Sequence, residues 1–155
     1  MKISFSNPKA VTSGVVVVGI NEGNKLSVSA ADIDKTSGGF LTRAIKASKF
    51  KGKKGETLNV MTPGGTKLDR VLLIGLGKSK ELGLSVALTL GGKVYAALAK
   101  SGVASTTVCI DGVDSDAKLT PDLASEFAFG ARLRSYRFDK YRTKEKAEDK
   151  PTLMA

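Results

Sequence analysis

The chain has 155 residues, of which 41% are hydrophobic and 26% are charged, a composition typical of one globular domain with no room for a second. It contains no histidine and a single cysteine, Cys109, which excludes a Ser-His-Asp triad, a Cys-His pair, a histidine-ligated zinc site and an intrachain disulfide. The net charge of +10 favours negatively charged partners without identifying any of them.

The first half of the chain predicts strands followed by two short helices. Alternating apolar residues indicate a strand at 2–6, and the valine run at 14–20 indicates a strand that is buried on both faces. The remaining elements that we expect in this half are a short strand at 26–28 and helices at 30–35 and 40–48, which the Gly38-Gly39 break separates.

The second half predicts further strands that alternate with two long helices. Aliphatic runs indicate strands at 57–61, 70–74 and 106–110. Apolar residues at helical spacing predict a helix that starts at Leu84 and ends before Gly102, within which Gly91 and Gly92 should pack closely against the sheet. The alternation predicts an α/β fold in which helices flank a mixed central sheet.

The last predicted helix begins at the sequence Thr120-Pro121-Asp122, which supplies an N-cap, a proline at the first helical position and an acidic first turn. The helix should bury a stripe of small and aromatic side chains, namely Ala124, Phe127, Ala128, Ala131 and Phe138.

The chain carries no sign of export or of membrane insertion. Its first ten residues lack the apolar run of a secretory signal, and its longest apolar run, at 15–20, is far shorter than the roughly 20 residues that span a bilayer. We therefore expect a cytoplasmic protein without a membrane partner.

The glycine-rich sequence after the strand at 70–74 suggests an anion-binding turn formed by Gly75, Gly77 and Lys78. Glycines at such a point can present backbone N–H groups to a phosphate. The sequence nevertheless fits neither the Walker spacing, which would require glycine at Leu72, nor the dinucleotide fingerprint, whose third glycine falls on Lys80. A plain strand-to-helix turn is the favoured interpretation.

A basic stretch precedes the strand at 57–61. Its side chains would contact phosphate groups if the domain bound nucleic acid, and the candidate contact residues are Arg43, Lys49, Lys51, Lys53 and Lys54. A solvated lysine-rich turn is the favoured alternative. Asp111 and the acidic residues after it are interpreted as a solvated turn, and Cys109 as a buried strand residue.

The folded region gives way to a charged C-terminal tail. The last residues hold few large apolar side chains, so we expect them to bury too little surface to offset the entropy of ordering. The predicted boundaries are 1–139 for a domain and 140–155 for the start of an interdomain linker.

Three segments of the sequence resemble the N-terminal domain of the cytosolic leucyl aminopeptidases, a family of di-metal hexameric enzymes. They are RVLLIGLGK with the helix after it, LTPDLASEFAFGARLRSYRFDKYRTKEK, and DKTSGGFLTRAIKASKFKGKKGETLNV. The resemblance covers nearly the whole chain, and its most specific parts are the GLGK turn and the SYRFDKY segment.

The resemblance implies a macro-domain-like three-layer fold followed by a catalytic domain that this sequence does not contain. The family's metal-binding signature, Asn-Thr-Asp-Ala-Glu-Gly-Arg-Leu, does not occur here, so we assign no catalytic and no metal-binding residue. The implied parent is a metal-dependent peptide hydrolase that removes N-terminal amino acids with two divalent metals, zinc or manganese. The implied partners are the parent's own catalytic domain, further copies in a hexamer and, in some bacterial members, DNA.

Assembly and positioning of the catalytic domain is therefore the expected role of this noncatalytic domain. Two binding functions remain as alternatives at this point. The macro-like fold would allow an ADP-ribose or nucleotide site at the GLGK turn, and the basic surface would allow a DNA-binding module.

Overall fold

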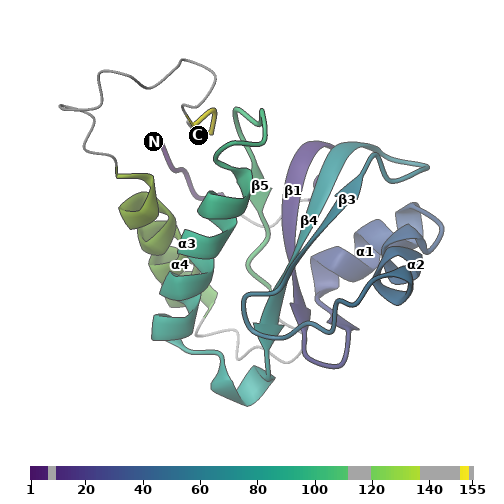
Figure 1. Ribbon diagram of the computed structural model, residues 1–155, viewed down its shortest axis with the longest axis horizontal. Coiled ribbons are helices and arrows are strands. Elements are labelled where there is room, and N and C mark those ends of the chain that lie inside the picture. The colour runs from purple at the N-terminus through teal and green to yellow at the C-terminus, as the bar shows by residue number, and fades with distance from the viewer. Residues whose placement is uncertain (7–9, 112–119, 137–150, 154–155) are drawn as a thin grey trace.

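The computed structural model describes residues 1–6, 10–111, 120–136 and 151–153. A mixed sheet lies between two pairs of helices, with α1 and α2 on one face and α3 and α4 on the other (Figure 1). The strands are β1 Ser13–Asn21, β2 Lys25–Leu26, β3 Thr57–Met61, β4 Lys67–Gly77 and β5 Thr107–Val108; the helices are α1 Val28–Thr36, α2 Phe40–Ala47, the 3-10 helix η1 Ser79–Glu81, α3 Leu84–Leu98 and α4 Thr120–Ser135. This arrangement confirms the predicted α/β fold with helices on both faces of a mixed sheet.

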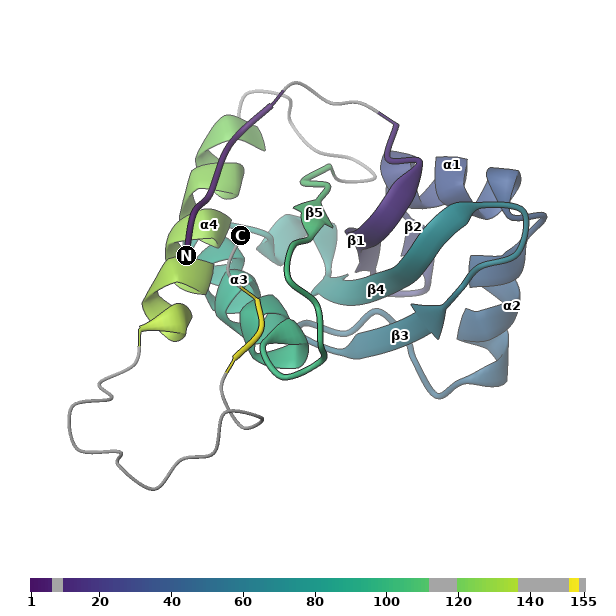
Figure 2. The same ribbon diagram turned by 90° about the horizontal axis from the view of Figure 1, so that it is seen from above.

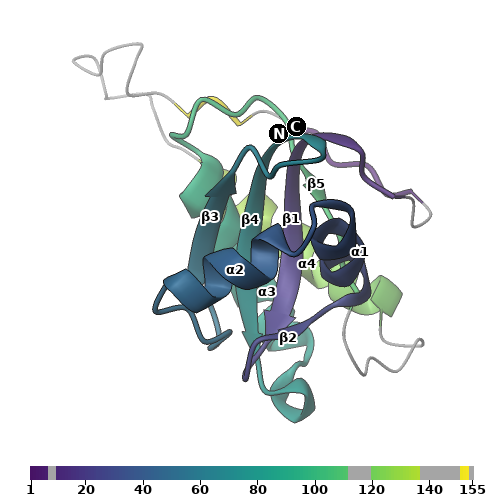
Figure 3. The same cartoon turned by 90° about the vertical axis from the view of Figure 1, so that its right-hand side faces the viewer.

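Strand β1 is the centre of the sheet. It pairs in parallel with β4 on one side, and on the other side it pairs in parallel with β5 and antiparallel with β2. Strand β3 pairs antiparallel with the outer edge of β4, so the described order is β2-β1-β4-β3 with β5 joined to β1 (Figure 3). The carboxyl ends of the parallel strands β1 and β4 lie side by side, with Asn21 paired to Gly77. The turns discussed below follow these ends.

The valine run forms β1 because both faces of this strand are covered. Val16, Val17 and Val18 are completely buried. Val17 contacts the cluster under α3 and α4, whereas Val16 and Val18 contact the cluster under α1 and α2. The prediction of a strand that is buried on both faces is confirmed.

Three other strand predictions were less accurate, of which the strand expected at 106–110 is shortened to β5 at Thr107–Val108. Residues 1–6 are exposed and are not part of a strand, because two alternating apolar residues bury too little surface to hold a strand in place. The short strand predicted at 26–28 ends at Leu26, since Ser27 is the N-cap of α1 and its hydroxyl accepts a hydrogen bond from the Ala30 N–H at 3.3 Å.

Helices α3 and α4 pack on each other with their backbones in direct contact. A Cβ atom added to Gly91 would overlap the carbonyl oxygen of Phe127, and one added to Gly130 would overlap the carbonyl oxygen of Leu88. Each glycine thus lies against the backbone of the other helix, and Figure 2 shows α3 and α4 side by side. The expectation that Gly91 packs against the sheet was wrong, because its close neighbour is α4.

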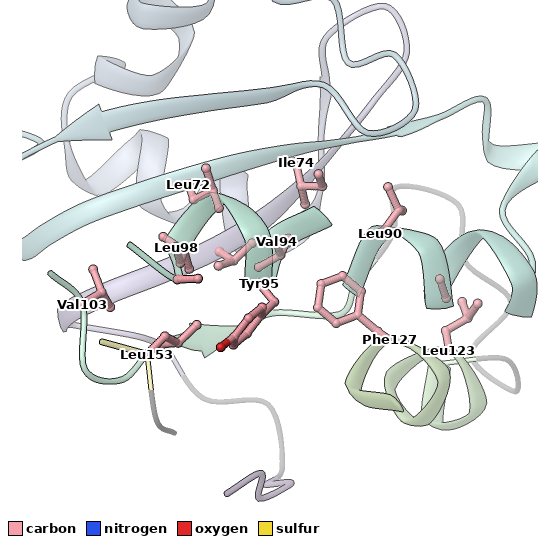
Figure 4. Close-up of a cluster of buried hydrophobic side chains, with 13 residues drawn as sticks. Leu72, Ile74, Leu90, Val94, Tyr95, Leu98, Val103, Leu123, Phe127 and Leu153 are labelled. Atoms are coloured by element: carbon pink, nitrogen blue, oxygen red, sulfur yellow. The ribbon is translucent and has the colours of Figure 1, made fainter. Parts of the chain in front are cut away.

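The cluster of buried side chains between the sheet and these two helices is shown in Figure 4. Leu123 and Phe127 of α4 are 6% and 7% exposed, and they point towards α3 and the sheet. The buried stripe predicted for this helix was partly wrong, because Ala124, Ala128 and Ala131 are only half-buried and Leu123 was missed. Phe138 lies outside the described residues.

The described part of the tail, residues 151–153, returns to the folded core. Leu153 is buried in the cluster under α3, and the Thr152 N–H donates a hydrogen bond of 2.8 Å to the carbonyl oxygen of Ala99, the C-cap of α3. The expectation that this end of the chain buries too little surface to be ordered was therefore wrong for Leu153. The boundaries 1–139 and 140–155 themselves stay a prediction.

Candidate functional site

The basic loop, residues 48–56 between α2 and β3, folds around its own carboxylate. The Glu56 carboxylate accepts hydrogen bonds of 2.9 Å from the backbone N–H groups of Lys51 and Lys53. Gly52 adopts a φ of 72°, and Phe50 is buried, which fixes the loop to the core. Two backbone N–H groups of this loop thus already bind an anion, the carboxylate of the loop's own Glu56.

These bonds change the acidity of Glu56. The hydrogen bond from the Lys51 N–H is the largest cause that lowers the pKa of this carboxyl below its ordinary value, with further lowering by the Lys53 N–H and the Lys53 charge. A carboxyl whose pKa is lower in the folded state stabilises the loop above its ordinary pKa, and this contribution is lost as the pH falls through the folded value.

We expect Glu56→Gln to loosen the loop near neutral pH, because a neutral amide oxygen accepts hydrogen bonds less strongly than a carboxylate. Amide exchange of Lys51 and Lys53 should become faster in the variant than in the unsubstituted chain. The difference should shrink as the pH falls through the lowered pKa that Glu56 has in the folded state, because below it the native side chain is also neutral. Equal exchange rates at neutral pH would contradict the assigned role of the carboxylate.

The predicted anion-binding turn lies beside this loop, and its two glycine donors are occupied. The Gly75 N–H donates to the carbonyl oxygen of Glu56 at 2.8 Å, and the Gly77 N–H donates to that of Gly52 at 3.0 Å. Lys78 lies 3.7 Å from Glu81 in an exposed ion pair. The turn therefore uses its backbone donors to hold the basic loop, which leaves neither glycine N–H free for a phosphate.

The residues predicted to contact nucleic acid are all exposed, and they belong to two elements, α2 and the basic loop. Arg43 belongs to α2, where its guanidinium lies 5.8 Å from the centre of the Phe40 ring. Lys54 lies beside Gly77, which joins the basic loop to the GLGK turn. Lys93 of α3 lies beside Gly55, a contact that the sequence did not reveal. Nucleic-acid binding through Lys49, Lys51 and Lys53 stays a prediction.

A small apolar pocket opens at the carboxyl ends of the parallel strands. It has a volume of about 40 Å³, room for a few water molecules, and lies between strands β1, β4 and β5 and the first turns of α3 and α4. Its walls include Gly19, Leu76, Leu90 and Phe127.

Two titratable groups, Cys109 and Asp111, line this pocket. Burial is the main cause that raises the pKa of the Cys109 thiol, so the thiol is protonated and weakly nucleophilic near neutral pH. One carboxylate oxygen of Asp111 accepts a 2.6 Å hydrogen bond from the Ser29 N–H, and the other finds no partner among the described residues. The described walls thus offer neither a thiolate nor a base paired with a nucleophile.

The part of the chain that the structure describes does not gather ligands for a metal. Within it, no group of three or more cysteine, aspartate or glutamate side chains lies close enough together to hold an ion. Over the same residues, no helix is long and apolar enough to cross a bilayer.

The chain has clear relatives among known proteins. The model of the cytosol aminopeptidase family, N-terminal domain, matches residues 17–145. The chain belongs to the cytosol aminopeptidase family. Among curated members, the probable cytosol aminopeptidase of Caulobacter vibrioides is 36% identical over 99% of this chain, and that of Nitrobacter winogradskyi is 36% identical over 96%.

The cytosol aminopeptidase relatives are much longer than this chain. The chain covers 30% of the Caulobacter protein and 29% of the Nitrobacter protein. A solved structure of a tomato leucine aminopeptidase mutant matches 92% of the chain with a TM-score of 0.67 and 26% identity, and the match covers 28% of that structure.

The macro-domain likeness is confirmed at the level of the fold. The macrodomain of Mycobacterium tuberculosis DarG matches 85% of this chain and 91% of its own length with a TM-score of 0.64. Since the two sequences are 14% identical, this likeness shows the fold alone. The nucleotide-binding alternative is not favoured, because both glycine donors of the GLGK turn are bonded to the basic loop.

Proposed function

We propose that this chain is a noncatalytic N-terminal domain that positions the catalytic portion of an aminopeptidase. The proposed parent is a cytoplasmic hydrolase that removes N-terminal amino acids from peptides and assembles as a hexamer. The observation that carries the proposal is the family match over 17–145, in a chain that covers less than a third of its relatives.

The chemistry available in the sequence supports a noncatalytic role. The sequence has no histidine, and its single thiol is half-buried with a raised pKa. Two divalent metals, zinc or manganese, would supply the parent with carbonyl polarisation and activation of water. The described residues do not provide a site for them, so the proposal assigns both metals to the polypeptide beyond this domain.

The proposal is tested with two proteins, the isolated 155-residue chain and the same chain joined at Ala155 to the C-terminal portion of the Caulobacter relative. With added Zn²⁺ or Mn²⁺, the isolated chain should hydrolyse no leucyl peptide, whereas the joined polypeptide should do so. Metal-dependent cleavage by the isolated chain would refute the noncatalytic role.

The positioning role requires a third protein, the C-terminal portion alone. We expect this portion to lose its hexameric state, its activity or both when the N-terminal domain is absent. If the portion alone keeps the size and the turnover rate of the joined polypeptide, the domain does not serve assembly or positioning.

A further inference from the structure

The C-terminal half of α4 and the residue after it, Tyr136, expose a stripe of large apolar side chains. Phe129, Leu133 and Tyr136 are 51%, 53% and 76% exposed. Phe129 and Leu133 are four residues apart on one side of α4, and a hydrogen bond of 3.2 Å from the Tyr136 N–H to the Leu133 carbonyl oxygen continues the last turn. Three neighbouring aromatic and aliphatic side chains in such a stripe form a patch, whereas isolated exposed apolar residues are ordinary on protein surfaces.

This stripe is separate from the face that holds α4 in the domain. The inward face carries Leu123, Phe127 and Gly130, which pack against α3 and the core. The helix therefore has two apolar faces, and its outer one remains exposed to solvent in this chain. A helix that is apolar on two sides is typical of an element between two packed layers.

The course of the chain indicates what covers the outer face. The family model assigns this domain to the N-terminal end of longer proteins, and the chain covers 30% of the Caulobacter relative. Among the described residues α4 is the last helix, and Thr152 and Leu153 lie against the C-cap of α3. A polypeptide that continues from there starts beside the layer formed by α3 and α4.

The size of the stripe favours a tethered partner over a second copy of the domain. Three side chains on half a helix offer a few hundred Å² at most, whereas stable interfaces between separate proteins bury roughly 1,200–2,000 Å². A partner on the same chain needs less area, because the linker supplies a high effective concentration. Arg132 is exposed on the same side of the helix, which suits a partner with acidic groups at the rim.

We propose that Phe129, Leu133 and Tyr136 form the docking surface for the catalytic portion of the same polypeptide. This inference rests on the proposed function and adds to it the residues that make the contact. In this contact the side chains of Phe129, Leu133 and Tyr136 lose their exposure to solvent.

Cysteine labelling tests the docking surface directly. In a Cys109→Ala background, Leu133→Cys is compared with Val28→Cys, whose native side chain is 63% exposed on α1 at the opposite face of the sheet. Each variant is prepared as the isolated chain and joined to the C-terminal portion of the Caulobacter relative, and reaction with a maleimide is followed by peptide mass spectrometry. Joining should slow labelling at position 133 about tenfold, as for a face that is uncovered about a tenth of the time, and should leave position 28 unchanged.

Three results would overturn the inference. Equal labelling rates at position 133 in both proteins would mean that the catalytic portion does not cover the stripe. Slow labelling in the dilute isolated chain would mean that the domain covers its own stripe, and protection that increases with the concentration of the isolated chain would identify a second copy as the partner.

The docking surface and the positioning role can fail independently of each other. If position 133 is protected while the C-terminal portion alone keeps full activity and assembly, the docking surface stands and the positioning role falls. If position 133 stays reactive while the domain is required for activity, the positioning role stands and the contact must lie elsewhere.

Discussion

Gly130→Ala should lower the free energy of unfolding by about 3 kcal/mol, the upper part of the range for overpacked sites. The added methyl group would overlap the carbonyl oxygen of Leu88 and would come within 2.7 Å of the Leu88 carbonyl carbon. Both are backbone atoms, so no side-chain rotation relieves the contact. Helices α3 and α4 must separate, which opens the core around Phe127 and Leu90. Gly91→Ala should have a similar effect, because its methyl group would overlap the carbonyl oxygen of Phe127.

Gly92→Ala provides the matched control for these two variants. Gly92 lies in the same helix as Gly91, but a Cβ atom at Gly92 would meet its nearest neighbour at 3.6 Å, an ordinary contact. Alanine is favoured over glycine inside a helix by about 1 kcal/mol, so this variant should be as stable as the original chain or slightly more stable. Urea unfolding followed by circular dichroism measures all three. Equal stabilities of the three variants would contradict the close helix contact.

The glycines of α3 illustrate what the sequence predicts and what it leaves open. Two adjacent glycines inside a helical pattern carry an energetic cost, and this cost indicated close packing. The partner was not predictable, because Gly130 lies in a segment far away in the sequence and a sheet would explain the same pattern. Only the crossing of α3 over α4 shows that Gly91 makes the backbone contact and that Gly92 does not.

The central strand was easier to predict than the sheet edges. A continuous valine run has one stable placement, between two covered faces, and β1 occupies it. The edges depend on weaker signals. The strand expected at 26–28 was shortened because Ser27 forms a helix cap, and the alternation at 2–6 did not lead to pairing in the described structure.

The basic loop and the GLGK turn show a different limit. Each segment alone suggested an anion site, since one supplies lysines and the other supplies glycines with available donors. Their mutual contact connects residues some 20 positions apart, and the contact uses the donors that an anion would need. The signal in the sequence was Glu56, the acidic residue that follows the lysines and accepts the loop's N–H groups.

A second large effect is therefore expected at Gly75. Gly75→Ala should lower the free energy of unfolding by about 2 kcal/mol, because the new methyl group would overlap the carbonyl oxygen of Lys53 and would lie 2.8 Å from the Gly52 carbonyl carbon. The loop must then move away from β4. This movement breaks the bonds of 2.8 Å that the Gly75 N–H donates to Glu56 and that the Gly75 carbonyl accepts from the Gly55 N–H.

Gly64→Ala is the matched control, because a Cβ atom there has no neighbour within 4 Å. Urea unfolding should show a loss of stability for Gly75→Ala and little change for Gly64→Ala. Amide exchange at Gly55 and Gly77 should also become faster in Gly75→Ala, since both N–H groups bond across the contact between the turn and the loop. A structural role for Gly75 requires both changes. A variant that kept its stability and its exchange rates would return the GLGK turn to the list of candidate anion sites, because its donors would then not be needed to hold the loop.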